Sequence, residues 1–283
     1  MDFTNFPRSG TYYGGSEKKI GIVIDDEEYM LKFQKKTPFG MRYNHLSEYI
    51  GCHIFEIADF SVQETFLGTY GSESVVACKN FIRADEQFVP FNDVGESTLD
   101  RDKELYQYDY DDIMQMLLDN SKLTNISETI DLFWEMYIMD ALLGNFDRHG
   151  GNWGFIKRNN KYSLAPVFDN GSCLFPQMID ENLMHVIIGS EEETRKRVYS
   201  FPTSQIKHHG RKSSYYEIIS SLEYPECNKA LISVADRIKS NFDAMFEMID
   251  DIKYISSIHK EFYKHMIRSR YELIIESSLR KMR

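Results

Sequence analysis

The sequence predicts an α+β fold in two lobes, a small β-rich N-terminal lobe and a mainly helical C-terminal lobe. Short apolar runs rich in β-branched residues fill the first third of the chain, whereas apolar residues recur at steps of three or four through most of the rest. A polar stretch with Pro90 and Gly95 separates the two patterns and is typical of a linker. We therefore expect an N-terminal lobe at residues 1–83, a linker or hinge region at 84–100 and a C-terminal lobe at 101–283.

The N-terminal lobe is predicted to hold two β-hairpins and one helix. Residues 19–24 and 28–33 are apolar runs on either side of three acidic residues, which is the pattern of a hairpin. Residues 44–59 carry apolar side chains at three- and four-residue steps, as one face of a helix does. Residues 62–70 and 74–82 are β-branched and aromatic, which favours a second pair of strands. This order predicts a small mixed sheet with one helix packed against it.

The C-terminal lobe is predicted to be mostly helical. Helices with apolar steps of three or four are expected at residues 109–120, 127–143, 213–222, 226–249 and 255–281. A single β-hairpin, at residues 153–157 and 161–167, interrupts them. Both ends of that hairpin carry carboxylate or amide side chains, so we expect the chemistry of the protein to concentrate there.

The charge of the chain argues against two classes of partner. Its 33 Lys and Arg residues oppose 44 Asp and Glu residues, which gives a formal net charge of −11 at pH 7. Such a surface repels phosphate polymers and anionic lipid, so we expect no nucleic acid as main partner and no membrane. The chain also lacks a long apolar run and the order of a signal peptide. We expect a monomer synthesised in the cytoplasm, with export by a route without a signal peptide left open.

The residues that could bind zinc or form disulfides are poorly spaced for either role. No cysteine pair has the CxxC spacing, and we expect four reduced, buried thiols, at Cys52, Cys78, Cys173 and Cys227. His208 and His209 are adjacent, so on a regular element their side chains would point apart and make a poor zinc pair. We expect these two histidines in a solvated loop.

Polar residues concentrate where a predicted helix leads into the hairpin of the C-terminal lobe. Asp147 and Asn152 lie five positions apart in this segment, and Asp169 follows the second strand of the hairpin by two residues. Phosphotransferases use this interval for a carboxylate that orients a hydroxyl and an amide that binds magnesium. Asp169 would be the second metal ligand, since Mg²⁺ takes one or two carboxylates together with phosphate oxygens and water. Alone, each piece fits an ordinary Asx turn, but the combination favours phosphoryl transfer.

A clamp for a nucleotide is predicted in the N-terminal lobe. Lys32 lies inside an apolar strand, where an ammonium group is costly unless it is paired or faces an anion. Glu48, in the first turns of the next helix, is its natural partner. Kinases hold the phosphates of ATP with a strand lysine of this kind, tethered by a helix glutamate. The alternative is a solvent-facing lysine on the hairpin, which would be preferred if Lys32 stood alone.

Two further segments complete the expected nucleotide site. Gly14 and Gly15 stand in a stretch suited to a backbone loop folded around a ligand. Lys19 offers either a further phosphate contact or a solvated side chain. The strand that joins the two lobes has backbone groups, at Cys78 and Asn80, that can pair with an adenine edge.

These motifs resemble those of a known family. Residues 145–152, with the sequence NFDRHGGN, and residues 165–169, with the sequence APVFD, are similar to the catalytic and metal motifs of the HipA-like bacterial Ser/Thr kinases. The glycine loop, Lys32, Glu48 and the joining strand follow in the order of that family, so the resemblance spans nearly the whole chain. It implies a two-lobed protein-kinase-like fold that binds ATP and Mg²⁺ and phosphorylates a protein substrate.

The resemblance also implies roles for individual residues. Asp147 would be the general base, Lys32 would act on the phosphates, and Asn152 and Asp169 would bind the metal ion. His149 would support the catalytic loop. The family further suggests autophosphorylation in the loop over the phosphates, where a phosphate would repel those of ATP and lower activity. The candidate hydroxyls are Ser9, Thr11 and Ser16, the last of which would also contact the nucleotide.

Other functions stay open at this point. A small-molecule or lipid kinase is an alternative, because the Asp-Arg-His-x-x-Asn loop is also similar to that of the phosphatidylinositol kinases. A pseudokinase that only binds a partner is a weaker alternative, since a scaffold needs none of the catalytic residues. A nucleophilic hydrolase is disfavoured, because the segment Gly171-Ser172-Cys173 lacks the GxSxG pattern of a nucleophile elbow.

Overall fold

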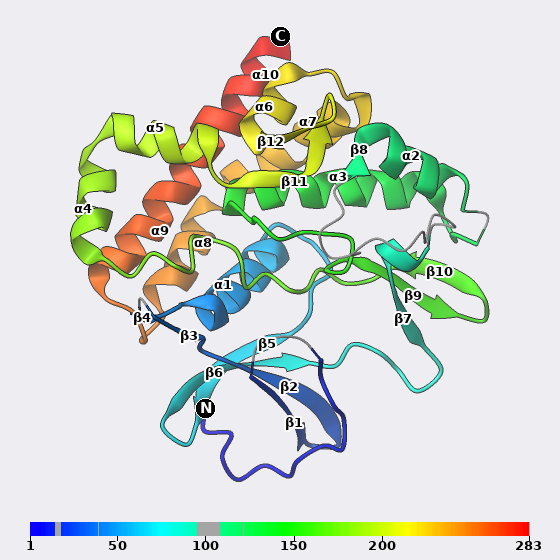
Figure 1. Ribbon diagram of the computed structural model, residues 1–283, viewed down its shortest axis with the longest axis vertical. Coiled ribbons are helices and arrows are strands. Elements are labelled where there is room, and N and C mark those ends of the chain that lie inside the picture. The colour runs from blue at the N-terminus through cyan, green and yellow to red at the C-terminus, as the bar shows by residue number, and fades with distance from the viewer. Residues whose placement is uncertain (15–17, 39, 95–107, 121, 283) are drawn as a thin grey trace.

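A four-stranded antiparallel sheet forms the N-terminal part of the computed structural model, which describes residues 1–283 except 15–17, 39, 95–107, 121 and 283. Its strand order is β1-β2-β6-β5, and it lies at the foot of the molecule in Figure 1. The β1–β2 turn places Asp25 and Asp26 at left-handed φ values of 49° and 64°, as a tight hairpin turn requires. The strands are β1 (Lys19–Ile24), β2 (Glu27–Phe33), β5 (Thr65–Tyr70) and β6 (Glu73–Lys79), with a short ladder of β3 (Lys36–Thr37) and β4 (Gly40–Met41).

One helix, α1 (Asn44–Ile57), joins the sheet to the helical part. It contacts β5 and β6, yet its buried residues Leu46, Ile50 and Ile54 belong to the large core of the helical part. The sheet has a separate small core, formed by Phe3, Ile22, Tyr29, Leu31, Phe33, Val75 and Ala77. Because side chains alternate along a strand, this small core lies on the face of β2 opposite Lys32. The Lys32 face of the sheet is therefore the one turned toward α1.

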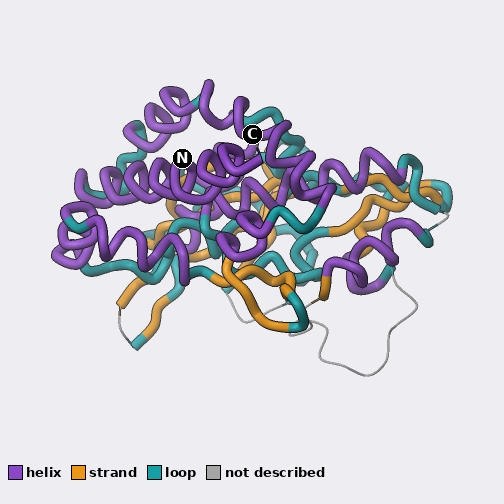
Figure 2. The backbone as a smooth tube through the Cα atoms, turned by 90° about the horizontal axis from the view of Figure 1, so that it is seen from above, coloured by secondary structure: helices purple, strands orange, loops and turns teal. Residues whose placement is uncertain are grey.

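The C-terminal part is mostly helical and encloses the large core. Its longest helix, α3 (Ile126–Leu143), is capped at its start by Asn125 and ended by Gly144, which has a left-handed φ of 62°. Seen from above, the helices spread across most of the width of the molecule, with the strands visible between and below them (Figure 2). The other helices are α2 (Tyr110–Leu118), α4 (Glu181–Gly189), α5 (Glu191–Ser200), α6 (Tyr215–Ser221), α7 (Pro225–Ser240), α8 (Phe242–Asp250), α9 (Ser257–Arg270) and α10 (Ser277–Met282), with the π-helical segment η2 (Tyr271–Glu276) between the last two.

Two three-stranded sheets flank these helices. The first has the order β10-β9-β7, and its strands are β7 (Gln87–Pro90), β9 (Gly154–Arg158) and β10 (Lys161–Leu164). The second has the order β12-β11-β8, and its strands are β8 (Tyr108–Asp109), β11 (Thr203–His208) and β12 (Arg211–Ser214). β8 runs parallel to β11. A short 3-10 turn, η1 (Phe91–Asp93), follows β7.

The structure differs from the predicted elements in the linker and in the number of hairpins. The stretch at 84–100, expected to be a polar linker, contains β7, because Phe88 and Val89 pair with β9 across the two parts of the chain. The lobe boundaries themselves stay a prediction. The hairpin expected in the C-terminal part is present as β9 and β10, but the expectation that it is the single one there is wrong, since β11 and β12 form a second hairpin. The helix expected at 226–249 is divided at Asn241 into α7 and α8.

Helices α4 and α5 are absent from the sequence prediction, and for α5 the sequence explains the omission. It has no apolar stripe, so its sequence lacks the periodicity by which a helix is recognised. Its first turn is instead capped by the Ser190 hydroxyl, which accepts from a backbone N–H. Two ion pairs spaced four residues apart, Arg195 with Glu191 and Arg197 with Glu193, add to this local stabilisation.

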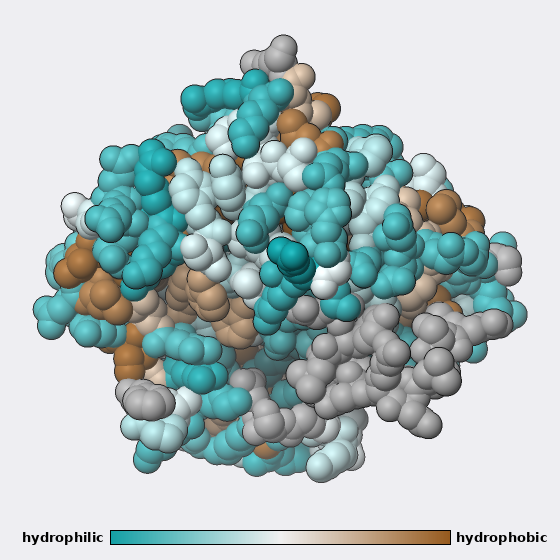
Figure 3. All heavy atoms as spheres, turned by 45° about the horizontal axis from the view of Figure 1, so that its top comes forward, coloured by the Kyte–Doolittle hydropathy of each residue, from teal (hydrophilic) through white to brown (hydrophobic). Residues whose placement is uncertain are grey.

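The hydrophilic surface and the buried, free cysteines agree with the expectations from the amino-acid composition. The face in Figure 3 is mostly hydrophilic, with hydrophobic residues confined to smaller patches. All four cysteines are buried and free, as predicted. Among the residues that the structure describes, none of the helices has both the length and the apolar content that crossing a bilayer requires.

Candidate active site

The buried ammonium group of Lys32 lies between two carboxylates. Its Nζ is 2.8 Å from Oε2 of Glu48 on α1 and 2.9 Å from Oδ1 of Asp169. Lys32 is only 6% exposed, and Glu48 is fully buried. Burial alone lowers the pKa of Lys32, but Asp169 and Glu48 outweigh it and raise that pKa well above its usual value. Lys32 is therefore charged at neutral pH, and the structure brings three of the predicted residues together.

Asp169 reaches Lys32 from a backbone conformation that is uncommon for its residue type. Its φ is 56°, in the left-handed region. Burial raises the pKa of Asp169, but Lys32 more than compensates, so the pKa is lowered overall and the carboxylate is charged. The preceding residue, Phe168, packs against Phe81 and Phe88 with ring centroids 5.5 and 5.2 Å away. Aromatic packing before Asp169 and the ion pair at its side chain together fix where its carboxylate points.

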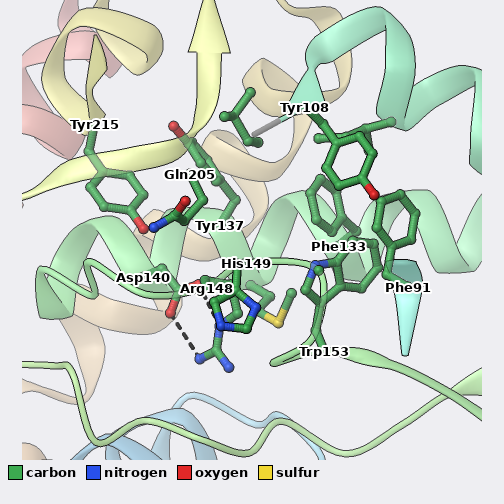
Figure 4. Close-up of a pocket in the computed structure, with 14 residues that line it drawn as sticks. Phe91, Tyr108, Phe133, Tyr137, Asp140, Arg148, His149, Trp153, Gln205 and Tyr215 are labelled. Atoms are coloured by element: carbon green, nitrogen blue, oxygen red, sulfur yellow. Dashed lines mark hydrogen bonds and ion pairs between the residues drawn. The ribbon is translucent and has the colours of Figure 1, made fainter. Parts of the chain in front are cut away.

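Arg148 connects the predicted catalytic segment, residues 145–152, to the segment that carries Asp169. Its guanidinium donates twice to Asp140 on α3, from Nε at 2.9 Å and from Nη2 at 3.1 Å (Figure 4). Nη2 also donates to Asn170 Oδ1 at 2.6 Å, and Nη1 donates to the backbone carbonyls of Asn152 and Phe168. The Nη1 atom of Arg148 thus binds the backbone carbonyls of Asn152 and Phe168 at the same time. The backbone of Asn152, the first predicted metal ligand, therefore lies beside the backbone of Phe168. Phe168 immediately precedes Asp169, the second predicted metal ligand.

Asp147 lies in the tight turn that follows α3. Its backbone N–H donates to Asn145 Oδ1 at 3.0 Å, and Asn145 Nδ2 donates in turn to Asp140 Oδ1 at 3.0 Å. The side chain of Asp147 is 47% exposed, so a substrate hydroxyl can reach it. His149 Nε2 lies 4.0 Å from Asp147 Oδ1, while His149 Nδ1 accepts from the backbone N–H of Gly151 at 3.0 Å. Because Nδ1 is an acceptor, Nε2 carries the ring proton and faces the carboxylate.

The side chain of Asn152 is oriented for oxygen ligation. Its Nδ2 donates to the backbone carbonyl of Asp147 at 2.8 Å, which turns Oδ1 away from that carbonyl. Mg²⁺ takes oxygen ligands, so the amide oxygen of Asn152 and the charged carboxylate of Asp169 match its donor preference. Arg148 holds the two segments next to each other. These residues therefore fit a magnesium ion that takes its remaining ligands from phosphate and water.

The glycine loop is described in part. Gly15 and Ser16 lie outside the described residues. Gly14 has open space where a side chain would project, and its carbonyl accepts from Lys19 Nζ at 3.1 Å. Lys19 stands directly opposite Lys32 in the β1–β2 ladder. Directly opposed residues lie on one face of a sheet, so Lys19 is on the same face as the clamp.

The candidate hydroxyls of Ser9 and Thr11 both lie near Glu28. Burial raises the pKa of Glu28, but the side chains of Ser9 and Thr11, among others, lower it overall. The backbone N–H of Ser9 donates to the carbonyl of Gly21 at 3.0 Å, which places this segment along β1. Thr11 is exposed, whereas Ser9 is partly buried.

The residues expected at the adenine edge have other partners. Cys78 lies in β6, between Met30 of β2 and Thr65 of β5, and is fully buried. Since β6 has a strand on both sides, the expectation that the backbone of Cys78 faces adenine is corrected: that backbone belongs to the interior of the sheet. Asn80 follows β6, and its backbone N–H donates to the carbonyl of Glu28 at 2.8 Å.

Four residues of this network are missing from the sequence prediction. Arg148 and Asp140 form its buried ion pair, Phe168 joins the aromatic contacts, and Asn170 donates its backbone N–H to Glu48 Oε1 at 3.1 Å. One signal was available, because Asp140 is an acidic residue inside the apolar sequence of α3 and a buried carboxylate needs a partner.

Two cavities adjoin the catalytic segment. Figure 4 shows the smaller, which lies beside His149 and Arg148 among aromatic side chains such as Phe133 and Trp153 and has a volume of about 20 Å³. The larger has a volume of about 480 Å³ and includes Phe146, the residue before Asp147, in its wall. An apolar hollow is thus present one residue from the predicted base.

Comparison with known proteins agrees with this geometry. The family model described as the HipA-like C-terminal domain matches residues 11–248. The serine/threonine-protein kinase CtkA of Helicobacter pylori strain J99 is 35% identical over 277 residues, which cover 95% of this chain and 84% of that protein. The crystal structure of the H. pylori proinflammatory kinase CtkA superposes with a TM-score of 0.89 at 32% identity, covering 99% of this chain and 97% of that one.

A more distant structure shares the fold. The HipA–HipB toxin–antitoxin complex with operator DNA from Shewanella oneidensis MR-1 matches with a TM-score of 0.58 at 16% identity, covering 94% of this chain and 65% of the matched chain. The predicted kinase-like α+β fold is confirmed by these structural matches. Because the family model spans most of the chain and a curated kinase matches nearly all of it, this chain belongs to the HipA-like C-terminal domain family, as a HipA-like serine/threonine kinase.

Proposed function

We propose that this kinase transfers the γ-phosphoryl group of ATP, bound with Mg²⁺, to a Ser or Thr hydroxyl of a protein substrate. The observation that carries the proposal is the buried ammonium group of Lys32, held between Glu48 and Asp169. A charged lysine on the inner face of the sheet is costly to bury even when it is paired. Its placement is accounted for by phosphate oxygens, which need a positive charge beside them.

The chain's own residues divide the work of transfer. Lys32 would contact the nucleotide phosphates, with Glu48 keeping its ammonium group in place. Asn152 and Asp169 would hold Mg²⁺, which when bound neutralises negative charge on the phosphates. Asp147 would accept the proton of the substrate hydroxyl, and its half-exposed carboxylate suits an acceptor that arrives from solvent. His149, through its ring N–H, would keep that carboxylate oriented.

The acceptor is proposed to be a protein. The cavity beside Phe146 offers a pocket for a substrate side chain close to the residue that accepts its hydroxyl proton. The net charge of −11 supports the further proposal that neither nucleic acid nor an anionic membrane is the main partner. We also propose that the protein acts as a monomer and that it modifies itself on the segment that contains Ser9, Thr11 and Ser16.

The catalytic proposal is tested by the variant Asp147→Asn. Transfer of radiolabelled phosphate from ATP to casein should fall at least about 100-fold, because the amide cannot accept the proton. Nucleotide binding, measured by calorimetry, should stay within about threefold of wild type. The matched control is Asp131→Asn, at a partly exposed position of α3, which should leave both unchanged. An Asp147→Asn protein that keeps more than a tenth of the wild-type rate would contradict the assignment.

The acceptor class is tested in the same assay. Free phosphoinositides and aminoglycosides are offered in place of casein, and label should appear only on protein. Label on lipid or aminoglycoside but not on casein would overturn the protein substrate while leaving the catalytic residues in place. Mass spectrometry after incubation with ATP should find phosphate between residues 9 and 16 in wild type and none in Asp147→Asn. An unmodified segment in active enzyme would remove the proposed autophosphorylation.

A further inference from the structure

Two histidines and a glutamate converge at the tip of the β11–β12 hairpin. Nε2 of His209 lies 2.9 Å from Oε2 of Glu223, and Nε2 of His208 lies 4.0 Å from Oε1 of the same carboxylate. The two imidazole ring centroids are 4.2 Å apart. All three ligand atoms fall within 4.8 Å of one another, and in the described part of the chain no other three His, Cys, Asp or Glu side chains converge in this way.

The turn of the hairpin explains why these adjacent histidines do not point apart. His209 and Gly210 have left-handed φ values of 50° and 70°, the conformation of a two-residue hairpin turn. His209 therefore leaves the alternation of the strand, and its ring comes to lie beside that of His208. The expectation of opposed side chains is corrected for this reason, and with it the argument against a metal pair.

Neighbouring aromatic residues hold His208 in one orientation. His208 Nδ1 is 2.6 Å from the hydroxyl oxygen of Tyr224, and the Tyr224 ring stacks on Tyr110 with centroids 4.7 Å apart. When Nδ1 carries the proton, it donates to that hydroxyl, and the lone pair of Nε2 then faces Glu223. Metal-binding histidines are oriented in this manner by a partner on the second ring nitrogen.

We propose that His208, His209 and Glu223 form a binding site for a transition-metal cation, with Zn²⁺ as its best-fitting member. Two imidazole nitrogens and one carboxylate are a three-ligand set that zinc accepts, with water in the fourth position. Ligands bonded at about 2.1 Å around a tetrahedral ion lie about 3.4 Å apart. The separations of 2.9 Å from His209 to Oε2 and 4.0 Å from His208 to Oε1 of Glu223 lie on either side of that spacing.

A simple ion pair accounts for less of the geometry. It would explain the 2.9 Å contact between His209 and Glu223, but it makes no use of His208, whose Nε2 lies 4.0 Å from the same carboxylate. Mg²⁺ is a poor fit, because it prefers oxygen ligands, whereas imidazole suits zinc and its neighbours in the transition series. The site is therefore chemically distinct from the oxygen ligands of Asn152 and Asp169.

A cation at this site would link two segments of the C-terminal part. The histidines belong to the β11–β12 hairpin, whereas Glu223 lies between α6 and α7. β11 also carries Gln205, whose Nε2 donates to the backbone carbonyl of Phe146 at 2.8 Å. The strand that would be fastened by the cation is thus the strand that contacts the residue before Asp147.

The test is a calorimetric titration of Zn²⁺ into the full-length, tag-free protein after chelation, in an excess of Mg²⁺. We expect one Zn²⁺ per chain and a raised unfolding temperature in its presence. His209→Asn keeps a residue that tolerates the left-handed turn, and Glu223→Gln keeps the shape of the side chain. Each should weaken Zn²⁺ binding at least tenfold. The control His185→Asn, at an exposed histidine of α4, should bind as wild type does.

The orientation of His208 is tested by Tyr224→Phe, which removes the hydroxyl but keeps the ring. Zn²⁺ affinity should fall roughly 10- to 100-fold. Circular dichroism verifies that each variant is folded. Wild-type protein that binds no Zn²⁺ would overturn the proposal, as would binding that persists unchanged in both His209→Asn and Glu223→Gln. Neither readout depends on kinase activity, so the outcome is independent of the proposed function.

Discussion

Replacing Asp140 by alanine should destabilise the protein far more than the same change at Asp131 on the same helix. Asp140 is fully buried and accepts two hydrogen bonds from Arg148. Asp131 forms an ion pair with Lys229 at the surface, where its side chain is 34% exposed. Both positions lie within α3, so the change in helix propensity is the same in the two variants. The comparison therefore contrasts a buried ion pair, to which Asn145 adds one further hydrogen bond, with a surface ion pair on the same helix.

The expected magnitudes differ several-fold. Removing one partner of a buried ion pair leaves an uncompensated charge and costs about 3–5 kcal/mol. A surface pair contributes about 0–1 kcal/mol. For a chain of this size each kcal/mol lowers the melting temperature by roughly 2–4 °C. Asp140→Ala should thus melt roughly 6–20 °C below wild type, and Asp131→Ala within roughly 4 °C of it.

The assay is thermal unfolding followed by circular dichroism and by calorimetry at neutral pH. The double variant Asp140→Ala/Arg148→Met removes the unpaired guanidinium and should recover part of the loss, because the penalty of a buried, uncompensated charge is then absent. If Asp140→Ala melts within the range of Asp131→Ala, the buried pair does not anchor the catalytic segment, and our account of how Asn152 and Phe168 are held together is wrong.

Three further outcomes are expected. Lys32→Met should lower kcat/KM for ATP at least about 100-fold, because the phosphates lose their positive partner; a loss below tenfold in steady-state kinetics would contradict the clamp. Burial lowers the pKa of His45 to about 4. The unfolded chain therefore binds a proton between about pH 6.5 and 4 that the folded chain does not, and the free energy of unfolding should fall by about 2–3 kcal/mol as the pH drops through that window. In His45→Leu, the free energy of unfolding measured with urea should depend less on pH in this window. A pH dependence equal to that of wild type would refute its assignment to His45. Burial raises the pKa of Cys52 to about 12, and all four thiols are buried, so Ellman's reagent should titrate them in denaturant but not in the native protein; rapid native reaction would show that a thiol is accessible.

The parts of the site that were predictable from the sequence are those that short-range spacing determines. Asp147 and Asn152 belong to one tight turn, so their interval of five positions already specifies that they are neighbours. Lys32 was recognisable because a charged side chain inside an apolar strand requires a partner. The hairpin of β1 and β2 and the helix α1 were likewise visible in alternation and periodicity.

The parts of the fold and the site that the sequence did not predict depend on contacts between distant segments, or on local interactions that leave no periodic pattern in the sequence. Arg148 bonds Phe168 and Asn170, which lie 20 and 22 positions later, and no spacing rule connects them. The helix α5 is held by a cap and ion pairs, so it has no apolar stripe to detect. The neighbouring rings of His208 and His209 follow from the left-handed φ of His209, which adjacency alone does not reveal.

The two hydrophobic cores have a consequence for how the lobes are aligned. Lys32 belongs to the sheet that has its own small core, whereas Glu48 belongs to a helix whose apolar face lies in the large one. Their ion pair therefore joins elements that belong to two different hydrophobic cores, beside the contacts of α1 with β5 and β6. Since packed interiors resist deformation, a rotation of the sheet against α1 would stretch this bond before it deforms either core. The separation of Lys32 Nζ from the Glu48 carboxylate, 2.8 Å here, thus reports, together with its 2.9 Å separation from Asp169, whether the sheet and the helical part are aligned.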